Sequence, residues 1–116
     1  MKSGSSYRPR AGDIIWLDFD PTKGHEQRGR RPALVVSART YNERSGLCVA
    51  CAITNRGKGY PFEVPLPKSH RTTGVVLADQ MRCISWTERS AELIEPVPQL
   101  VLNDVREKIA ALLGIE

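Results

Sequence analysis

The stretch DIIWLDFD, residues 13–20, has the side-chain pattern of a β-strand. Its side chains alternate between two faces, with Ile15, Leu17 and Phe19 on one face and Ile14, Trp16 and Asp18 on the other. A period of two residues is typical of a β-strand, because successive side chains of a strand point to opposite faces of the sheet. Pro21 follows directly and begins a loop over residues 21–31, which contains Gly24 and Gly29.

Short apolar segments of the same kind follow one another along the chain. We predict strands at PALVVS (32–37), LCVACAITN (47–55), FEVPL (62–66), GVVLAD (74–79) and MRCISW (81–86), the last two continuous through Gln80. Pro65 either weakens the third of these strands or places it at a sheet edge. A helical turn closed by Gly46 is expected over 38–46, and a turn over 56–61.

The C-terminal segment changes to a helical period. From about Pro98 to Leu113, apolar residues recur three or four positions apart, and Gly114 is a plausible stop. The expected inward-facing set is Val101, Val105, Ile109, Leu112 and Leu113. Because no helical crossover separates the strands, we predict a mainly β fold of the α+β class, a small antiparallel barrel with a C-terminal helix at its edge.

Length and composition limit the classes of protein to consider. The chain has 116 residues, 41% hydrophobic and 26% charged, with a formal net charge of +4. These values indicate one globular domain that is compatible with a polyanionic partner. No apolar run is long enough for a membrane helix, and residues 1–13 lack the apolar core of a secretion signal. We therefore expect a flexible tail over residues 1–11, a single domain over 12–116 and a cytoplasmic location.

Cys48 and Cys51 form a C-x-x-C pair, which raises the possibilities of a zinc site and a redox site. Both cysteines fall within an expected strand, where residues three apart point to opposite faces. A redox pair normally stands at a helix N-terminus, and a zinc site needs a second pair of ligands. With only three cysteines, a disulfide framework is also disfavoured. We expect core or half-buried cysteines and no metal site.

The loop that leads into residues 32–37 carries most of the candidate chemistry. GHEQRGRRPALVVS (24–37) places several charges directly before an apolar strand. An arginine fork can grip phosphate oxygens, and a threonine hydroxyl at a strand end can hold another. If strands 32–37 and 47–55 are neighbours, Arg31 and Thr54 share a rim. The alternatives are a surface arginine paired with Glu26 and a threonine that only satisfies its own strand end.

Three segments resemble the MazF/PemK toxins of bacterial toxin–antitoxin modules. They are GDIIWLDFDPTKGHEQRGRRPALVVS, KGYPFEV and GVVLADQMRCISW, in order between Gly12 and Trp86. The resemblance implies a small barrel of the Src-homology-3 type, shared with the gyrase poison CcdB, and a homodimer. It also implies a sequence-specific endoribonuclease that cleaves single-stranded mRNA without metal or cofactor and leaves 2′,3′-cyclic phosphate and 5′-hydroxyl ends. Translation and growth would stop until a MazE-like antitoxin covers the basic groove with an acidic tail.

The resemblance assigns roles to particular residues. Arg31, Thr54 and Glu26 fall on the family's catalytic positions. His25, where relatives often carry a smaller polar residue, is a possible acid or base. A second departure is Asn55, directly after the threonine, which with Arg56 would line the substrate groove, so that the target sequence is expected to differ from that of the best-known relatives. The candidates for RNA contacts are Gln27, Arg56, Lys58, Gln80 and Arg82, each with an ordinary solvated side chain as the alternative. His70 lies in a variable loop, and Trp16 and Trp86 are expected in the core or at a dimer interface.

Two other classes of function stay open from the sequence. Toxins of the same barrel type poison DNA gyrase without catalysis and depend on a tryptophan near the end of the last helix. This chain ends LLGIE, with Leu113 before Gly114, which argues against that class. The other alternative is a barrel that binds RNA without cleaving it. Replacing Arg31 by alanine would separate a pure binder from an enzyme, because an enzyme loses turnover.

Overall fold

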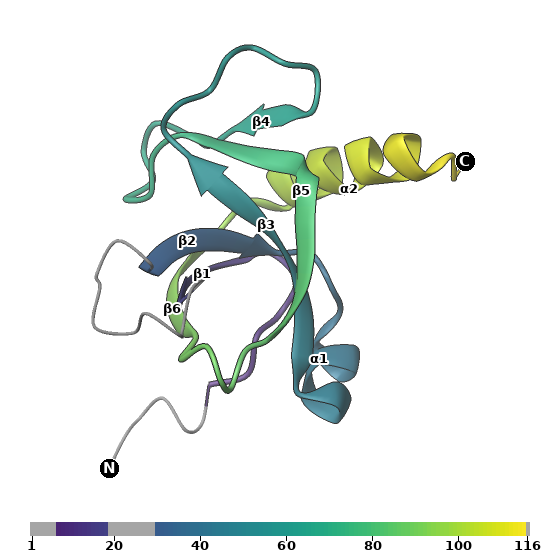
Figure 1. The fold of residues 1–116 in the computed structure, drawn as a ribbon. Helices are drawn as coiled ribbons and strands as arrows, with labels where there is room; N and C mark the ends of the chain where they lie inside the picture. Colours follow the sequence, from purple (N-terminus) through teal and green to yellow (C-terminus); the bar gives the residue numbers. More distant parts are fainter. Residues whose placement is uncertain (1–6, 19–29, 116) are drawn as a thin grey trace.

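The computed structural model describes residues 7–18 and 30–115. The elements, drawn in Figure 1, are β1 (Asp13–Asp18), β2 (Arg30–Val35), α1 (Arg39–Ser45), β3 (Leu47–Thr54), β4 (Glu63–Pro65), β5 (Val75–Ser85), β6 (Glu92–Pro96) and α2 (Gln99–Leu113). The predicted strands and both predicted helical segments are confirmed. β5 is one continuous strand through Gln80, as expected.

The strands form one antiparallel sheet in the order β4-β5-β3-β2-β1-β6. The sheet curves into a half-barrel, and α2 lies across one side of it (Figure 1). β3 lies in the middle and pairs with β2 on one side and β5 on the other. β4 is an outer strand, which is where Pro65 can be accommodated without loss of a ladder hydrogen bond.

Each face of the sheet has its own apolar core. The cluster on the face toward α2 includes Ile14, Leu34, Cys51 and Val76 of the sheet and Val105 of the helix. The opposite face includes Ile15, Leu17, Ala33, Val35, Cys48 and Ala50, with Tyr7 and Trp86 packed against it. The alternation in residues 13–18 therefore separates two buried clusters, because Ile14, Ile15 and Leu17 are all fully buried.

The structure differs from the sequence-based expectations in three places. β6 was not predicted, because ELIEP is short, ends in proline and carries exposed Glu92 and Leu93. Leu112 and Leu113 are 44% and 55% exposed rather than core, because the last turn of α2 extends past the sheet (Figure 1). The expected tail of residues 1–11 is packed from Tyr7 onward: Pro9 is buried, and the Tyr7 hydroxyl donates to Asp13 at 2.7 Å.

The loop between β4 and β5 joins the two ends of the half-barrel. From this loop Arg71 donates to the carbonyl of Ile94 at 3.1 Å, and Nε2 of His70 lies 3.1 Å from the carbonyl oxygen of Pro96. The Glu95 carboxylate accepts the backbone N–H of Thr72 at 2.8 Å and of Arg71 at 3.3 Å. Burial alone would raise the pKa of Glu95, but these donors outweigh it and lower that pKa. Glu95 therefore stays ionised and holds this loop against β6.

The C-x-x-C pair belongs to the two cores, as predicted. Cys48 and Cys51 are fully buried in different clusters, and burial raises the pKa of each thiol to about 12. Cys83, in contrast, is exposed on β5. No helix in the described part of the chain is long and apolar enough to cross a membrane.

We expect one cysteine to react with a thiol reagent in the native protein. At mildly alkaline pH almost no thiolate forms at Cys48 or Cys51, and thiolate is the reactive species. Titration with a chromogenic disulfide should release one equivalent natively and three after denaturation. Cys83→Ser should abolish the native signal, and a native reaction at Cys48 or Cys51 would contradict the packing described above.

Candidate active site

Arg31 and Thr54 lie on the neighbouring strands β2 and β3. β2 and β3 pair with Ala33 opposite Ala52 and Val35 opposite Ala50. Continued by two residues on each strand, this register brings Arg31 opposite Thr54. Directly opposite residues of an antiparallel pair project to the same side. The predicted shared rim is therefore supported by the strand pairing.

The two adjacent arginines of β2 have different surroundings. Arg30 donates to Asp18 at 3.0 Å and to the Ser90 carbonyl at 3.1 Å, and it also pairs with Glu92. Arg31 lies on the other face of the strand and is exposed. Within the described residues no ion pair engages its guanidinium.

Thr54 is the last residue of β3, and its hydroxyl makes one hydrogen bond within the protein. Oγ1 accepts the backbone N–H of Arg56 at 3.1 Å, which closes a tight turn after the strand. A hydroxyl that accepts one hydrogen bond still has its own proton to donate. Thr54 is half-buried, so the turn fixes its side chain while leaving it accessible.

Thr73 and Gly74 hold the backbone around Thr54. The Thr73 hydroxyl donates to Oδ1 of Asn55 at 2.8 Å. Gly74 has a φ of +111°, and a Cβ there would lie 2.8 Å from the carbonyl carbon of Thr54 and closer still to its oxygen. Only glycine permits this contact at such a φ. Gly74, directly before β5, therefore packs on Thr54, the residue that the family resemblance predicts to be catalytic.

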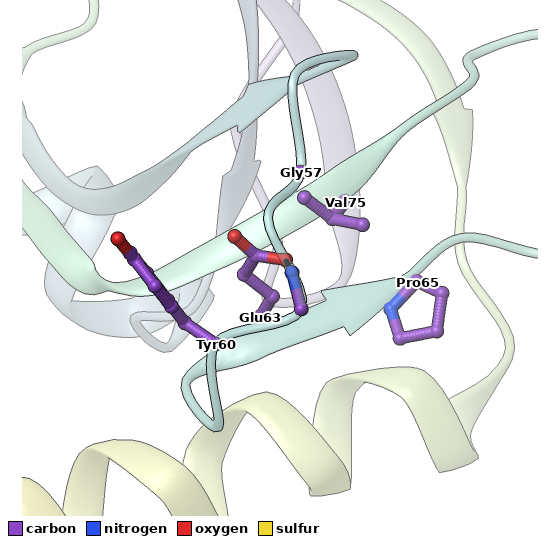
Figure 2. A pocket seen from close by; sticks show the side chains of 6 residues that line it. Gly57, Tyr60, Glu63, Pro65 and Val75 are labelled. Atoms are coloured by element: carbon purple, nitrogen blue, oxygen red, sulfur yellow. Dashed lines mark hydrogen bonds between the residues drawn. The ribbon is translucent and has the colours of Figure 1, made fainter.

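The loop from Asn55 to Tyr60 is held by one carboxylate. Glu63 accepts the backbone N–H of Lys58 at 2.9 Å and of Gly59 at 2.9 Å. Figure 2 shows the pocket beside this loop, of about 530 Å³, lined by Gly57, Gly59, Tyr60, Glu63, Pro65 and Val75. Val75 is also the pairing partner of Thr54 on β5, so the pocket adjoins the Arg31–Thr54 pair.

The other predicted contact residues are distributed unevenly. Arg56 and Lys58 are exposed on the loop after Thr54. Arg82 pairs with Ala50, four residues before Thr54 on β3, which separates it from Thr54 by about 13 Å along the strand. Gln80 is exposed where the β3–β5 register shifts. His25, Glu26 and Gln27 lie outside the described residues.

Two expectations on aromatic and loop residues can be compared with the structure. Trp86 packs against the core cluster of Ile15 and Leu17 and donates its Nε1–H to the Asn42 carbonyl at 3.0 Å, which confirms a core role. Trp16 is 39% exposed. His70 contacts β6 rather than the Arg31–Thr54 pair.

Sequence reasoning missed Tyr60, Glu63, Thr73 and Gly74 as parts of this site. The only signal for Tyr60 and Glu63 was the glycine-rich, basic turn GKGYPFE (57–63), in which a carboxylate closely follows two glycines. The Thr73 contact depends on strand pairing, which the sequence does not specify.

The arrangement as a whole suits a phosphate ester. An exposed guanidinium and a strand-end hydroxyl face the same side, and Arg56 and Lys58 add positive charge beside them. Among the residues that the structure describes, no group of three histidine, cysteine or acidic side chains is placed to hold a metal ion. Charge on a bound phosphate would be met by arginine and hydroxyl donors.

Comparison with known proteins finds a family profile and sequence relatives that cover most of the chain. The profile of the family described as "PemK-like, MazF-like toxin of type II toxin-antitoxin system" matches residues 10–113. The chain is 47% identical to the endoribonuclease toxin MazF of Escherichia coli K12, over 95% of this chain and 98% of that protein. It is 37% identical to the endoribonuclease PemK of Escherichia coli, over 88% of this chain and 80% of that protein.

Solved structures agree with the sequence relatives. A crystal structure of MazE–MazF from Deinococcus radiodurans superposes with a TM-score of 0.86 at 47% identity, covering 96% of this chain and all of that one. This similarity confirms the predicted fold class, since the strand order and the C-terminal helix belong to one shared architecture.

Proposed function

The chain belongs to the PemK-like, MazF-like family of toxins of type II toxin–antitoxin systems, and we propose that it is a sequence-specific endoribonuclease of single-stranded RNA. The observation that carries the proposal is the β2–β3 register, with Ala33 opposite Ala52, which extrapolates by two residues on each strand to Arg31 and Thr54. The names of the E. coli relatives, both endoribonucleases, support the reaction class.

The proposed reaction uses the nucleophile that RNA itself carries. The 2′-hydroxyl loses its proton and its oxygen attacks the adjacent phosphorus, while the bond from phosphorus to the 5′-oxygen breaks and that oxygen gains a proton. The products are a 2′,3′-cyclic phosphate and a 5′-hydroxyl. Because negative charge grows on the non-bridging oxygens at the transition state, fixed donors aimed at them accelerate the step.

Arg31 and Thr54 would supply those donors. The guanidinium can form two parallel hydrogen bonds to phosphate oxygens, and it remains protonated because its intrinsic pKa is far above neutrality. The Thr54 hydroxyl, fixed by the Arg56 N–H, can donate to a further oxygen. These two residues bind and stabilise charge, and the proposal requires no metal and no cofactor.

Residues of the loop over 21–31, the first loop, would carry out the proton transfers. A carboxylate such as Glu26 can accept the 2′-hydroxyl proton, and His25 has a side chain whose ordinary pKa suits either proton transfer. Both residues lie outside the described part of the chain and are proposed from the family resemblance alone.

The remaining RNA contacts divide by location. Arg56 and Lys58 follow Thr54 on an exposed loop and are placed for the sugar-phosphate backbone near the cut. Arg82 and Gln80 lie further along β5 and would contact nucleotides more distant from it. Gln27, in the first loop, completes the proposed set of contacts.

We also propose a partner, an assembly and a location. A cognate antitoxin of the MazE kind would cover the basic surface around Arg56 and Lys58 with an acidic segment. The MazE–MazF structure from Deinococcus radiodurans supports this expectation. We further propose a homodimer and a cytoplasmic location, where mRNA is available for cleavage. Residues 12–116 would form the toxin domain.

The test uses purified protein and a long single-stranded RNA in excess chelator. We expect discrete cuts that map to one short sequence, with cyclic phosphate and 5′-hydroxyl ends. An oligonucleotide with one 2′-deoxy sugar at the cut position should resist cleavage while it still binds. Cleavage of the 2′-deoxy oligonucleotide would overturn the proposed route, and no cutting at all would favour the non-catalytic alternatives.

Thr73 gives a separate test of how Asn55 is positioned. Thr73→Val removes the hydroxyl that donates to Asn55 but keeps the side-chain shape. We expect relaxed sequence preference and a loss of about 5-fold in kcat/KM, in keeping with about 1 kcal/mol for one hydrogen bond. Thr73→Ser should retain wild-type preference in the same mapping assay, and equal behaviour of the two variants would exclude this role.

A further inference from the structure

We propose that the pocket lined by Tyr60 and Glu63 is a nucleobase subsite, which seats one base of the RNA next to the scissile phosphate. The inference rests on the proposed function and adds to it a recognition element. Tyr60 would stack on the face of the base, and Glu63 would accept a hydrogen bond from its edge. We call this surface the Tyr60 pocket; its lining residues are Gly57, Gly59, Tyr60, Glu63, Pro65 and Val75.

The position of the pocket supports a base that neighbours the cut. Val75 forms one wall of the pocket and pairs with Thr54 across the β3–β5 ladder. Gly57 forms another part and lies three residues after Thr54 in the turn that fixes the threonine hydroxyl. A nucleotide whose phosphate lies on Arg31 and Thr54 therefore has this pocket within reach of an adjacent base.

Tyr60 offers an aromatic surface that the fold does not otherwise use. Tyr60 is 60% exposed, and its backbone is held in a turn through Pro61, where the Tyr60 carbonyl accepts the Glu63 N–H at 3.0 Å. Figure 2 shows the side chains of Tyr60 and Glu63 extending in the same direction at the pocket. Unstacked bases of single-stranded RNA are commonly held on such rings.

Glu63 gives the pocket a hydrogen-bond acceptor that is already oriented. Oε1 accepts the backbone N–H of Lys58 at 3.1 Å and of Gly59 at 2.9 Å, while among the described residues Oε2 accepts from the Lys58 N–H alone, at 2.9 Å. A carboxylate oxygen can accept more than one hydrogen bond, so Oε2 has capacity left. A carboxylate repels phosphate, which makes a base with N–H donors on its edge the suitable occupant.

The surrounding charge favours RNA over an apolar ligand. Arg56 and Lys58, both exposed, precede the ring on the same loop and can hold the phosphates on either side of the base. The apolar walls, Val75 and Pro65, exclude water from the stacked face. Positive charge interleaved with an exposed aromatic ring is typical of surfaces that bind single strands.

The experiment compares wild type, Tyr60→Ala and Tyr60→Phe. The probe is an uncleavable RNA oligonucleotide, 2′-deoxy at the cut site, with the fluorescent base 2-aminopurine placed in turn at each nearby position. We expect one position to be quenched on binding by wild type and Tyr60→Phe but not by Tyr60→Ala. In cleavage assays Tyr60→Ala should raise KM roughly 5- to 150-fold, the equivalent of one lost base stack, with little change in kcat.

The outcomes separate this inference from the proposed function. If wild type cleaves RNA and Tyr60→Ala has an unchanged KM and unchanged quenching at every position, the subsite is wrong and the endoribonuclease stands. If cleavage is unchanged but the complex with the cognate antitoxin weakens, the pocket belongs to the antitoxin and the inference is also overturned. Because Tyr60 is exposed, thermal melting should be unaffected in both variants, which excludes unfolding as the cause.

Discussion

Arg31→Ala is expected to lower kcat for RNA cleavage by at least about 10²- to 10³-fold, the usual loss when one donor to a developing oxyanion is removed. Arg31 is exposed, and the neighbouring Arg30 makes the ion pairs with Asp18 and Glu92. The variant should therefore fold like wild type. Single-turnover cleavage of a defined oligonucleotide, with saturating protein, measures the chemical step directly.

Two controls make this expectation specific. Arg31→Lys keeps the charge but loses the planar fork, so we expect partial recovery of binding with a kcat still well below wild type. Arg30→Ala, in contrast, should reduce stability through loss of the Asp18 pairing and reduce kcat much less. A wild-type kcat in Arg31→Ala would remove this residue from the active site.

The second large effect is expected on stability. Gly74→Ala should lower the free energy of unfolding by about 3–5 kcal/mol, because the new Cβ combines a strained φ with a clash against the Thr54 carbonyl. For a domain of this size the melting temperature should fall by about 12–20 °C. Thermal and urea denaturation followed by circular dichroism would measure both quantities.

Gly46→Ala is the matched control for backbone strain. Gly46 also has a positive φ, +74°, at the end of α1, but a Cβ there meets nothing within 4 Å. We expect a cost of about 1 kcal/mol, the left-handed penalty alone. If Gly74→Ala proved as mild as Gly46→Ala, the close packing of β5 on Thr54 would be contradicted. The Gly74→Ala protein that remains folded should also cleave RNA poorly, since Thr54 would be displaced.

Much of the fold could be predicted from local pattern. The alternation in residues 13–18 and the C-x-x-C spacing in β3 both separated the two faces of the sheet correctly, because the period of a strand is fixed by its geometry. β6 was missed because its exposed residues give no alternation. Leu112 and Leu113 were misplaced because helical periodicity does not report where the supporting sheet ends.

The candidate site could be predicted only in part. Arg31 and Thr54 were identified by the family resemblance, while their opposition required the register of β2 on β3, a non-local property. Thr73 and Gly74 approach Thr54 only through the pairing of β3 with β5. No single-sequence pattern specifies which strand ends meet, so residues that support a site from another strand escape such reasoning.

The central claim is that Arg31 and Thr54 act on the same phosphate, and a double-mutant cycle tests it most directly. Single-turnover cleavage rates would be compared for wild type, Arg31→Ala, Thr54→Ala and the double variant, in chelator and with folding checked by circular dichroism. Residues that stabilise one transition state together are strongly non-additive, so the double variant should be little worse than the poorer single variant. Fully multiplicative losses, or wild-type cleavage in either single variant, would contradict the account.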